Sequence, residues 1–389
     1  MTKEISLIPL LAPKMAVVFI GFLVAGMALP VLPIHVHNDL GFGSFIVGLI
    51  TGSQFLSSLI TRVWAGDFAD RSGPKKAVVM GLWGAAAAGV LYWISALAVS
   101  KPAVSAAVLI AGRGVLGGAE GLVLTGAVAW GLATAGPANA GRVIAWVGTA
   151  MFGALAVGAP LGTALFSIFG FSAIAAATAL LPFATVLLVL PMTAVAGRGK
   201  SFTSRKTVIA AVWLPGLGSA LCSVGYGAIL TFSVLLFASH GWTNGWMAVT
   251  AFAIALVGSR LFIGHLPDTL GGPVTAFAFA LVEVLGLLLL AIAPIPVVGM
   301  IGAAFVGLGY SLVFPGFGVA VVRAAPPESR GMAMGLYSAC LDFALAGSGP
   351  LLGLIGDSAG LQMAFFVAAF IVLLSTPVAA VIMRQSAIR

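Results

Sequence analysis

Charged side chains inside apolar segments are the groups that could do chemistry in this chain. Arg113, Glu120, Glu283 and Asp342 each stand within a long apolar run, where a charge costs at least about 2.5 kcal/mol at the centre of a membrane helix. Arg113 and Glu120 are seven positions apart, so they share one face of a helix. The carboxyl of Glu120 beside a cation could exchange a proton. This face is therefore a candidate for ion coupling, with an internal structural network as the alternative. Asp342 is as compatible with a buried contact between helices as with a functional role.

A second charged cluster lies between two apolar runs, at residues 66–76. Its sequence is Gly-Asp-Phe-Ala-Asp-Arg-Ser-Gly-Pro-Lys-Lys, and we expect its two glycines to form a tight reversal. The acids beside the bases could form ion pairs or approach a helix N-terminus and so latch two helices together. A hairpin that only places positive charge at the cytoplasm is the alternative, but it would not need the acids. The candidate gate residues are Gly66, Asp67, Asp70, Arg71, Gly73 and Lys75.

This cluster has a fainter copy 198 positions later. Gly264, Asp268 and Gly271 repeat the spacing of its first glycine, second aspartate and last glycine. The shift is close to half of the 389 residues, which predicts two halves built on one plan. Internal repeats of this kind are common in membrane transporters.

The composition indicates that these residues are positioned by membrane helices. The chain is 61% hydrophobic and 7% charged, with a mean hydropathy of +1.18, and such a composition does not suit a water-soluble surface. Runs of about 20 apolar residues can cross about 30 Å of hydrocarbon, and long runs without alternation predict helices rather than barrel strands. We predict twelve spans, at about 13–35, 44–65, 77–99, 104–131, 142–166, 171–195, 207–238, 246–264, 273–293, 297–322, 331–355 and 361–384.

The basic residues orient these spans. The formal net charge is +8, and a cytoplasmic N-terminus places nearly all Lys and Arg on or near the cytoplasmic side. Lys101 alone falls in an outer loop, and Arg113 lies within a span. This asymmetry is the positive-inside pattern, so the excess charge does not indicate nucleic-acid binding. We expect both termini in the cytoplasm.

Several other kinds of chemistry find no support in the sequence. His35 and His37 stand two apart in an expected extended loop and define no metal site, and Cys222 and Cys340 lie within expected helices, where they imply no disulfide or metal cluster. We find no phosphate-binding loop and no nucleophile constellation, so neither an enzyme nor ATP-driven coupling is indicated. We expect no cofactor and no metal.

Three motifs together resemble the major facilitator superfamily over the whole chain. Residues 66–75 resemble the loop G-x-L-A-D-R-x-G-R-K between its helices two and three, with Phe68 in place of Leu and Pro74 in place of a base. Residues 113–119 resemble the R-x-x-x-G-x-x element of proton-coupled members. Residues 153–162 resemble the Gly-Pro element of antiporters, interrupted by Ala159.

Further residues resemble one branch of that superfamily. The segments 141–146 (Gly-Arg-Val-Ile-Ala-Trp) and 158–162 (Gly-Ala-Pro-Leu-Gly), with Glu120 after the helix-four motif, are similar to the YhhS/YfcJ branch.

The resemblance implies an all-α integral membrane fold of twelve transmembrane helices in two pseudo-symmetric six-helix bundles. The expected bundles are residues 1–196 and 207–389, joined by a cytoplasmic linker at 197–206. Alternating access would come from rocking of the bundles around a substrate near the midplane.

The resemblance also implies roles for single residues. Asp70 would engage the start of helix eleven near Gly331 when the transporter opens outward. Tyr226 and Tyr310 would lie in cavity-lining helices, with glycine-mediated packing as an equal alternative. Helix nine is peripheral in the family, so Glu283 is expected to face lipid or to serve packing.

The function we expect is proton-coupled efflux of a small apolar or amphipathic compound by a secondary active transporter, because few charges line the spans. A sugar or metabolite symporter or uniporter is one alternative, and a non-transporting membrane sensor is another. The expected partners are a small-molecule substrate, protons and the lipid bilayer of a bacterial inner membrane, and we expect the protein to function as a monomer. The residues expected at the coupling and substrate sites are Arg113, Glu120, Tyr226, Tyr310 and Asp342.

Overall fold

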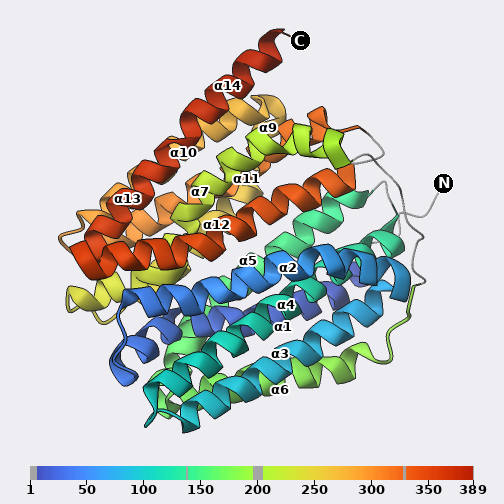
Figure 1. The fold of residues 1–389 in the computed structure, drawn as a ribbon. Helices are drawn as coiled ribbons and strands as arrows, with labels where there is room; N and C mark the ends of the chain where they lie inside the picture. Colours follow the sequence, from blue (N-terminus) through green and yellow to red (C-terminus); the bar gives the residue numbers. More distant parts are fainter. Residues whose placement is uncertain (1–6, 137–138, 196–204, 327–329, 389) are drawn as a thin grey trace. The chain divides into compact units, whose positions relative to one another are not determined.

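The computed structural model describes residues 7–136, 139–195, 205–326 and 330–388, and helices make up nearly all of this part (Figure 1). Twelve of its segments are long and apolar enough to cross a membrane, which confirms the predicted all-α fold of twelve spans. The elements are α1 (Leu7–Ile34), the π-helical η1 (His35–Asp39), α2 (Ser44–Ser72), α3 (Pro74–Leu97), α4 (Pro102–Ala135), α5 (Ala140–Phe169), α6 (Phe171–Val189), α7 (Arg205–Ser239), α8 (Trp246–Ile263), α9 (Leu266–Thr269), α10 (Gly272–Ala291), α11 (Pro296–Ala324), α12 (Arg330–Ala359), α13 (Leu361–Leu373) and α14 (Ser375–Ile388).

The last predicted span is interrupted in the structure. It consists of α13 and α14 with Leu374 between them. Pro377 has no N–H, so it cannot donate to the carbonyl of Leu373 as a continuous helix requires. The break therefore follows from one proline that the hydrophobic pattern does not reveal.

Contacts between Cα atoms divide the chain into two compact units. The first unit comprises Met1–Ala28 and Ser57–Ser201, and the second comprises Leu29–Leu56 and Phe202–Arg389. In the first unit α3 packs against both α4 and α6, and in the second α10 packs against α11 and α12 against α7 (Figure 1). Residues 29–56 thus group with the C-terminal half of the chain. The bundle limits at 196 and 207 stay predictions, and most of the predicted linker lies outside the described residues.

The duplicated motif has one glycine turn in each copy. Gly73 has φ 93° and ψ 143°, and Gly271 has φ 94° and ψ 137°, a backbone conformation that favours glycine. Each of these glycines is the N-cap of the helix that follows, α3 in one copy and α10 in the other. Two turns 198 positions apart with the same geometry support the predicted repeat.

The expectation of a reversal at Gly66 is wrong. The helix α2 continues through Gly66 to Ser72, and Gly66 is not among the glycines with positive φ. Arg71 and Asp67 form a two-point ion pair one turn apart, with Nη2–Oδ2 at 2.9 Å and Nε–Oδ1 at 3.0 Å. Such i,i+4 pairs support a helix, so the charged cluster is mostly helical and turns at Gly73 alone.

Glycines bring α1 and α5 together within the first unit. A Cβ at Gly158 would lie 2.9 Å from the Cα of Gly26, and one at Gly162 would collide with the backbone of Met27. Membrane helices associate largely through close backbone packing at small residues. The helix α5 runs through Pro160 without ending, so the segment that resembles the antiporter element is a packing surface against α1.

We expect Gly162→Ala to lower the stability of the protein strongly, because the new methyl group must push the backbone of α1 away. Overpacking typically costs about 1–3 kcal/mol. Gly153→Ala is the matched control on the same helix, since its Cβ would meet no described atom of another element within 4 Å. Thermal unfolding of the purified variants measures the difference, and equal melting temperatures would contradict this account of the α1–α5 contact.

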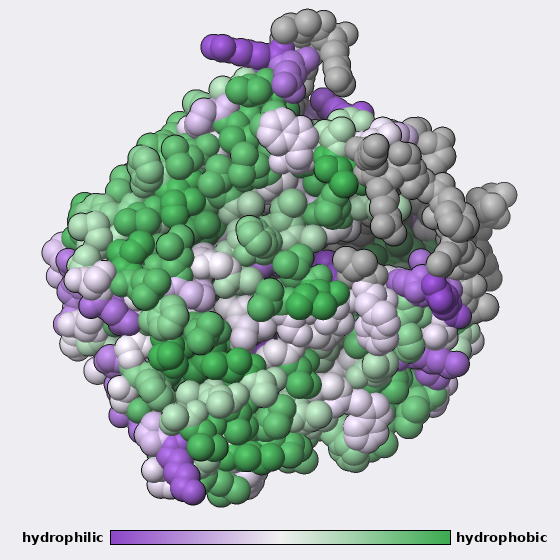
Figure 2. Space-filling view, viewed as in Figure 1, coloured by the Kyte–Doolittle hydropathy of each residue, from purple (hydrophilic) through white to green (hydrophobic). Residues whose placement is uncertain are grey.

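Large hydrophobic side chains cover much of the molecular face drawn in Figure 2. A monomeric soluble protein rarely exposes apolar patches on this scale, whereas side chains that face lipid tails are apolar. The most exposed include Leu97, Ile168, Leu188, Phe262 and Phe343.

Candidate functional site

Arg113 and Glu120 of α4 lie in the interior of the first unit. Their side chains are 1% and 9% exposed. Nη1 of Arg113 donates a long hydrogen bond of 3.4 Å to the hydroxyl of Tyr92 on α3, and Nε of Arg113 has no partner among the described residues. The hydroxyl of Tyr92 also interacts electrostatically with Glu120. The structure thus gathers a cation, a carboxyl and a phenol on two adjacent helices.

Small residues on α3 and α4 make this arrangement possible. A Cβ at Gly81 would lie 2.7 Å from the carbonyl oxygen of Ala119, and one at Gly112 would lie 3.0 Å from the ring of Tyr92. The two backbones can therefore approach closely enough for the phenol to reach the guanidinium. Tyr92 was missed at the level of sequence, because nothing in its own segment shows which residue of α4 it faces.

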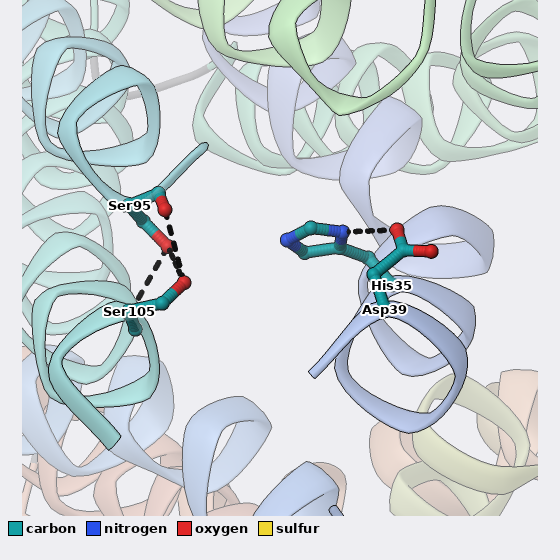
Figure 3. A network of polar contacts seen from close by, with 4 residues as sticks. All are labelled: His35, Asp39, Ser95 and Ser105. Carbon is teal, nitrogen blue, oxygen red and sulfur yellow. Dashed lines mark hydrogen bonds and ion pairs between the residues drawn. The ribbon is translucent and has the colours of Figure 1, made fainter. Parts of the chain in front are cut away.

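A reciprocal serine pair joins the same two helices near their connection (Figure 3). Oγ of Ser95 and Oγ of Ser105 are 2.7 Å apart, and each hydroxyl lies 3.0 Å from the backbone carbonyl of the other residue. Both side chains are fully buried. Hydrogen bonds of this kind contribute roughly 0.6 kcal/mol in a membrane bundle. The pair fixes the register of α3 against α4 within one helical turn of Tyr92.

Aromatic rings form a stack in the second unit, and both predicted tyrosines belong to it. The rings of Tyr226 on α7 and Tyr310 on α11 have centroids 4.9 Å apart at 26°. Tyr226 also stacks on Phe252 of α8 at 5.4 Å and 12°. The hydroxyl of Tyr310 lies 3.2 Å from Oγ of Ser223. The sequence pointed to the two tyrosines separately, and the structure brings them together.

The stack continues toward α12. Phe314 lies 6.4 Å from Tyr310 and 4.8 Å from Tyr337, whose hydroxyl donates to the carbonyl oxygen of Phe314 at 2.6 Å. Arg260 of α8 interacts electrostatically with both stacked tyrosines. We call Phe252, Tyr226, Tyr310, Phe314 and Tyr337 the aromatic stack. Three of these five were missed, since their neighbours come from other helices far away in the sequence.

Two acids of the second unit differ in how well they were predicted. Asp342 of α12 is 2% exposed, so it is buried as expected, and its role stays a prediction. Glu283 of α10 is fully buried at 0% exposure, so the expectation that it could face lipid is wrong. Gly225 and Gly309 on neighbouring helices leave the space that admits its side chain.

The candidate gate residues have separate partners in the first unit. Asp67 and Arg71 pair with each other on the surface of α2. Nζ of Lys75 donates to the carbonyl oxygens of Leu190 and Met192, at 2.6 Å each, and so caps the C-terminal end of α6. Asp70 is exposed near the end of α2. The predicted latch between Asp70 and the start of α12 stays a prediction.

The histidines near the end of α1 are more ordered than expected. His35 and His37 lie in the π-helical η1 rather than in an extended loop. His35 is 2% exposed, and its Nδ1 lies 2.6 Å from Oδ2 of Asp39 (Figure 3). Within the described ranges, no three side chains among His, Cys, Asp and Glu gather as a metal site would require.

Comparison with known proteins shows the family of the chain. The sequence profile of the Major Facilitator Superfamily matches residues 15–281 and 216–387. An uncharacterized MFS-type transporter of Salmonella typhimurium, STM4428, is 39% identical over 372 residues and covers 95% of each chain. The uncharacterized MFS-type transporter YhhS of Escherichia coli is 38% identical over 355 residues, covering 91% of this chain and 87% of its own, which confirms the predicted branch.

A solved structure gives the same fold. The crystal structure of a point mutant of the nucleoside transporter NupG superposes with a TM-score of 0.75 at 15% identity, covering 96% of this chain and 99% of its own. A likeness at this identity concerns the fold alone. Taken with the matched profile and the relatives, it leads to one conclusion: the chain belongs to the Major Facilitator Superfamily and is a multi-pass secondary transporter rather than an enzyme.

Proposed function

We propose that this transporter uses a proton gradient to expel a small apolar or amphipathic compound by alternating access. The observation that carries the proposal is the buried group of Arg113, Glu120 and Tyr92. A fixed guanidinium compensates the charge of a nearby carboxylate, and a phenol can donate to it or accept from a cation. In this proposal Glu120 gains and loses one proton during each transport cycle, which a coupling group must do.

The aromatic stack supports the proposed substrate class. Its five rings are largely apolar and stack on one another, and aromatic surfaces bind flat or apolar compounds with little need for hydrogen bonds. Phe252, Tyr310 and Tyr337 are buried in this conformation, so in this proposal a substrate reaches the rings only when the surrounding helices move. Arg260 interacts electrostatically with Tyr226 and Tyr310, and the hydroxyl of Tyr310 lies beside Ser223, so a few polar groups accompany the rings. A sugar would require a richer set of convergent donors and acceptors, so the sugar symporter is the less favoured candidate.

The test is a flux screen in proteoliposomes that contain a pH-sensitive dye. We expect amphipathic compounds to trigger proton movement opposite to their own, and an imposed gradient to drive their accumulation. Glycerol, simple sugars and nucleosides serve as the comparison set. Proton movement triggered by a sugar in the same direction as its uptake would overturn the proposal in favour of symport.

Both termini lie in the cytoplasm in this proposal, because the basic residues lie on one side of the predicted spans. We expect a cysteine at Lys76 to react with an impermeant maleimide only from the cytoplasm and one at Ser100 only from outside. Both positions are exposed, and Cys222→Ser and Cys340→Ser remove the background. Cells labelled before and after permeabilisation report the side, and the reversed pattern would contradict the orientation.

We also propose that Asp70 latches the cytoplasmic side when the transporter opens outward. Its side chain is exposed near the C-terminal end of α2, where another helix can approach it. Arg71 and Lys75 are already held by Asp67 and by the end of α6, so they rigidify the segment that presents Asp70. A carboxylate is favoured at a helix N-terminus, which is the partner that the proposed latch requires.

A further inference from the structure

Glu283 is a buried acid of the second unit that the proposed function does not use. It lies near the middle of α10 and is fully buried. Neither of its carboxyl oxygens has a partner in good hydrogen-bonding geometry among the described residues, and the thiol that lies close to them, on Cys222, is a weak donor. Leaving a buried polar group unsatisfied is destabilising, and more so when the group is charged. A group that is kept at such a cost requires a physical explanation.

The surrounding helices make room for this carboxyl. A Cβ at Gly225 of α7 would collide with Oε1 of Glu283. A Cβ at Gly309 of α11 would lie 2.7 Å from the Cβ of Glu283. Leu287 and Val372 complete the wall as apolar neighbours of Gly225. Glycines on two different helices thus form a space that fits Glu283, which a lipid-facing or accidental acid would not need.

The titratable groups that face Glu283 are neutral at ordinary pH. The thiol of Cys222 on α7 interacts with the carboxyl, although it donates its hydrogen bond to Oγ of Ser375 on α14 at 3.0 Å. The phenol of Tyr310 on α11 interacts with Glu283 electrostatically and is held by Ser223. A carboxylate at this point has no described cation to compensate it, whereas a carboxylic acid needs none.

We propose that Glu283 is a proton-binding site of the second unit, whose carboxylate takes one proton from water to form a buried acid and returns it when the surrounding helices move apart. The site borders the aromatic stack through Tyr310. A substrate that displaces Tyr310 would therefore change the surroundings of the acid. The proton site itself is independent of Glu120, which lies in the first unit, and only its use in transport rests on the proposed function.

Infrared spectroscopy of the purified protein in lipid vesicles tests the site with protons alone. We expect a carbonyl band of a protonated carboxylic acid in the wild type that is lost in Glu283→Gln and retained in Glu120→Gln. We also expect this band to shift after transfer to D₂O, because a site that binds and releases protons must exchange with solvent. A wild-type spectrum without a band assignable to Glu283, or a band that never shifts in D₂O, would overturn the proposal.

A second variant keeps the test independent of how Glu283→Gln folds. Gly225→Ala retains the carboxyl but forces a methyl group against Oε1, so the band is expected to change frequency. Gly258→Ala is the control, since its Cβ would meet no described atom of another element within 4 Å. A carbonyl band with the same frequency in Gly225→Ala and Gly258→Ala would belong to another carboxyl and would likewise overturn the assignment.

The use of the site in transport is read separately, by the pH dependence of flux in Glu283→Gln and Glu283→Asp. We expect the Asp variant to keep a pH-dependent rate and the Gln variant to lose it. Because the infrared experiment needs no substrate, a protein that shows the exchanging acid but no proton-driven efflux would refute the proposed function and leave the proton site intact.

Discussion

Replacing Glu120 by Gln is expected to abolish proton-driven accumulation of the substrate. The exchange of substrate for substrate across a membrane with equal pH on both sides should remain. The amide has nearly the size of the carboxyl and most of its hydrogen-bonding capacity, but it does not titrate. If one proton is exchanged per substrate, a gradient of one pH unit sustains about tenfold accumulation, and the variant should show none. Concentrative flux and counterflow in the same proteoliposomes measure the two processes.

Glu120→Asp is the matched control for this loss, because it keeps a titratable carboxyl on the same helix face. Partial recovery in the Asp variant would separate coupling from packing. If the Gln variant accumulates substrate with the wild-type dependence on pH, Glu120 is not the coupling carboxyl, and Asp342 and Glu283 become the remaining acids to test.

The fold was largely predictable because the bilayer limits it. Long apolar runs must be helices in lipid, so composition and run length predicted all twelve spans. The turn at Gly73 was also predictable, since a tight reversal favours glycine, which readily adopts the positive φ that the structure shows. The helical conformation of Gly66 was not predicted, because glycine occurs both in turns and inside helices. The i,i+4 pair of Asp67 and Arg71 is the signal that could have corrected it.

The candidate site was predictable only along single helices. Helical periodicity placed Arg113 and Glu120 on one face, and both are buried. Their partner Tyr92, and the rings that join the two predicted tyrosines, depend on which helices are neighbours, which one sequence does not show. Glu283 was predicted to face lipid or to serve packing, and only its full burial excludes the first alternative. The glycines that admit it, Gly225 and Gly309, are on other helices, so the sequence alone could not decide.

The grouping of residues 29–56 with the second unit has a clear basis at the start of α2. The carboxylate of Asp357, in the last turn of α12, accepts the backbone N–H of Ser44 at 2.6 Å and that of Phe45 at 2.9 Å. Gly43 leaves room for it, since a Cβ there would lie 2.8 Å from both carboxylate oxygens. Along the same helices, a Cβ at Gly349 would lie 2.5 Å from the carbonyl oxygen of Gly48. The start of α2 is thus fixed to α12 by a charge and by backbone contact.

We expect Asp357→Asn to release the start of α2. The first four N–H groups of a helix have no acceptor within the helix, and Asp357 accepts two of those in α2. A carboxylate at a helix start is worth about 1–2 kcal/mol through hydrogen bonding and the helix dipole. The Asn side chain has one acceptor oxygen instead of two and directs an NH₂ group at a backbone donor. About 1.4 kcal/mol corresponds to a tenfold change in an equilibrium, so the amides of Ser44 and Phe45 should exchange with deuterium roughly tenfold faster, as measured by mass spectrometry.

The same substitution should change transport, because the proposed alternating-access cycle would open and close this contact. Asp357→Asn is expected to favour the state in which α2 and α12 are apart, whereas Asp70→Asn, at the other end of α2, is expected to favour the opposite state and to reduce flux strongly. Ser358→Ala is the matched control, since among the described residues its hydroxyl donates to carbonyls of its own helix. Unchanged amide protection at residues 44 and 45 in Asp357→Asn would show that the glycine contact alone holds the two helices together.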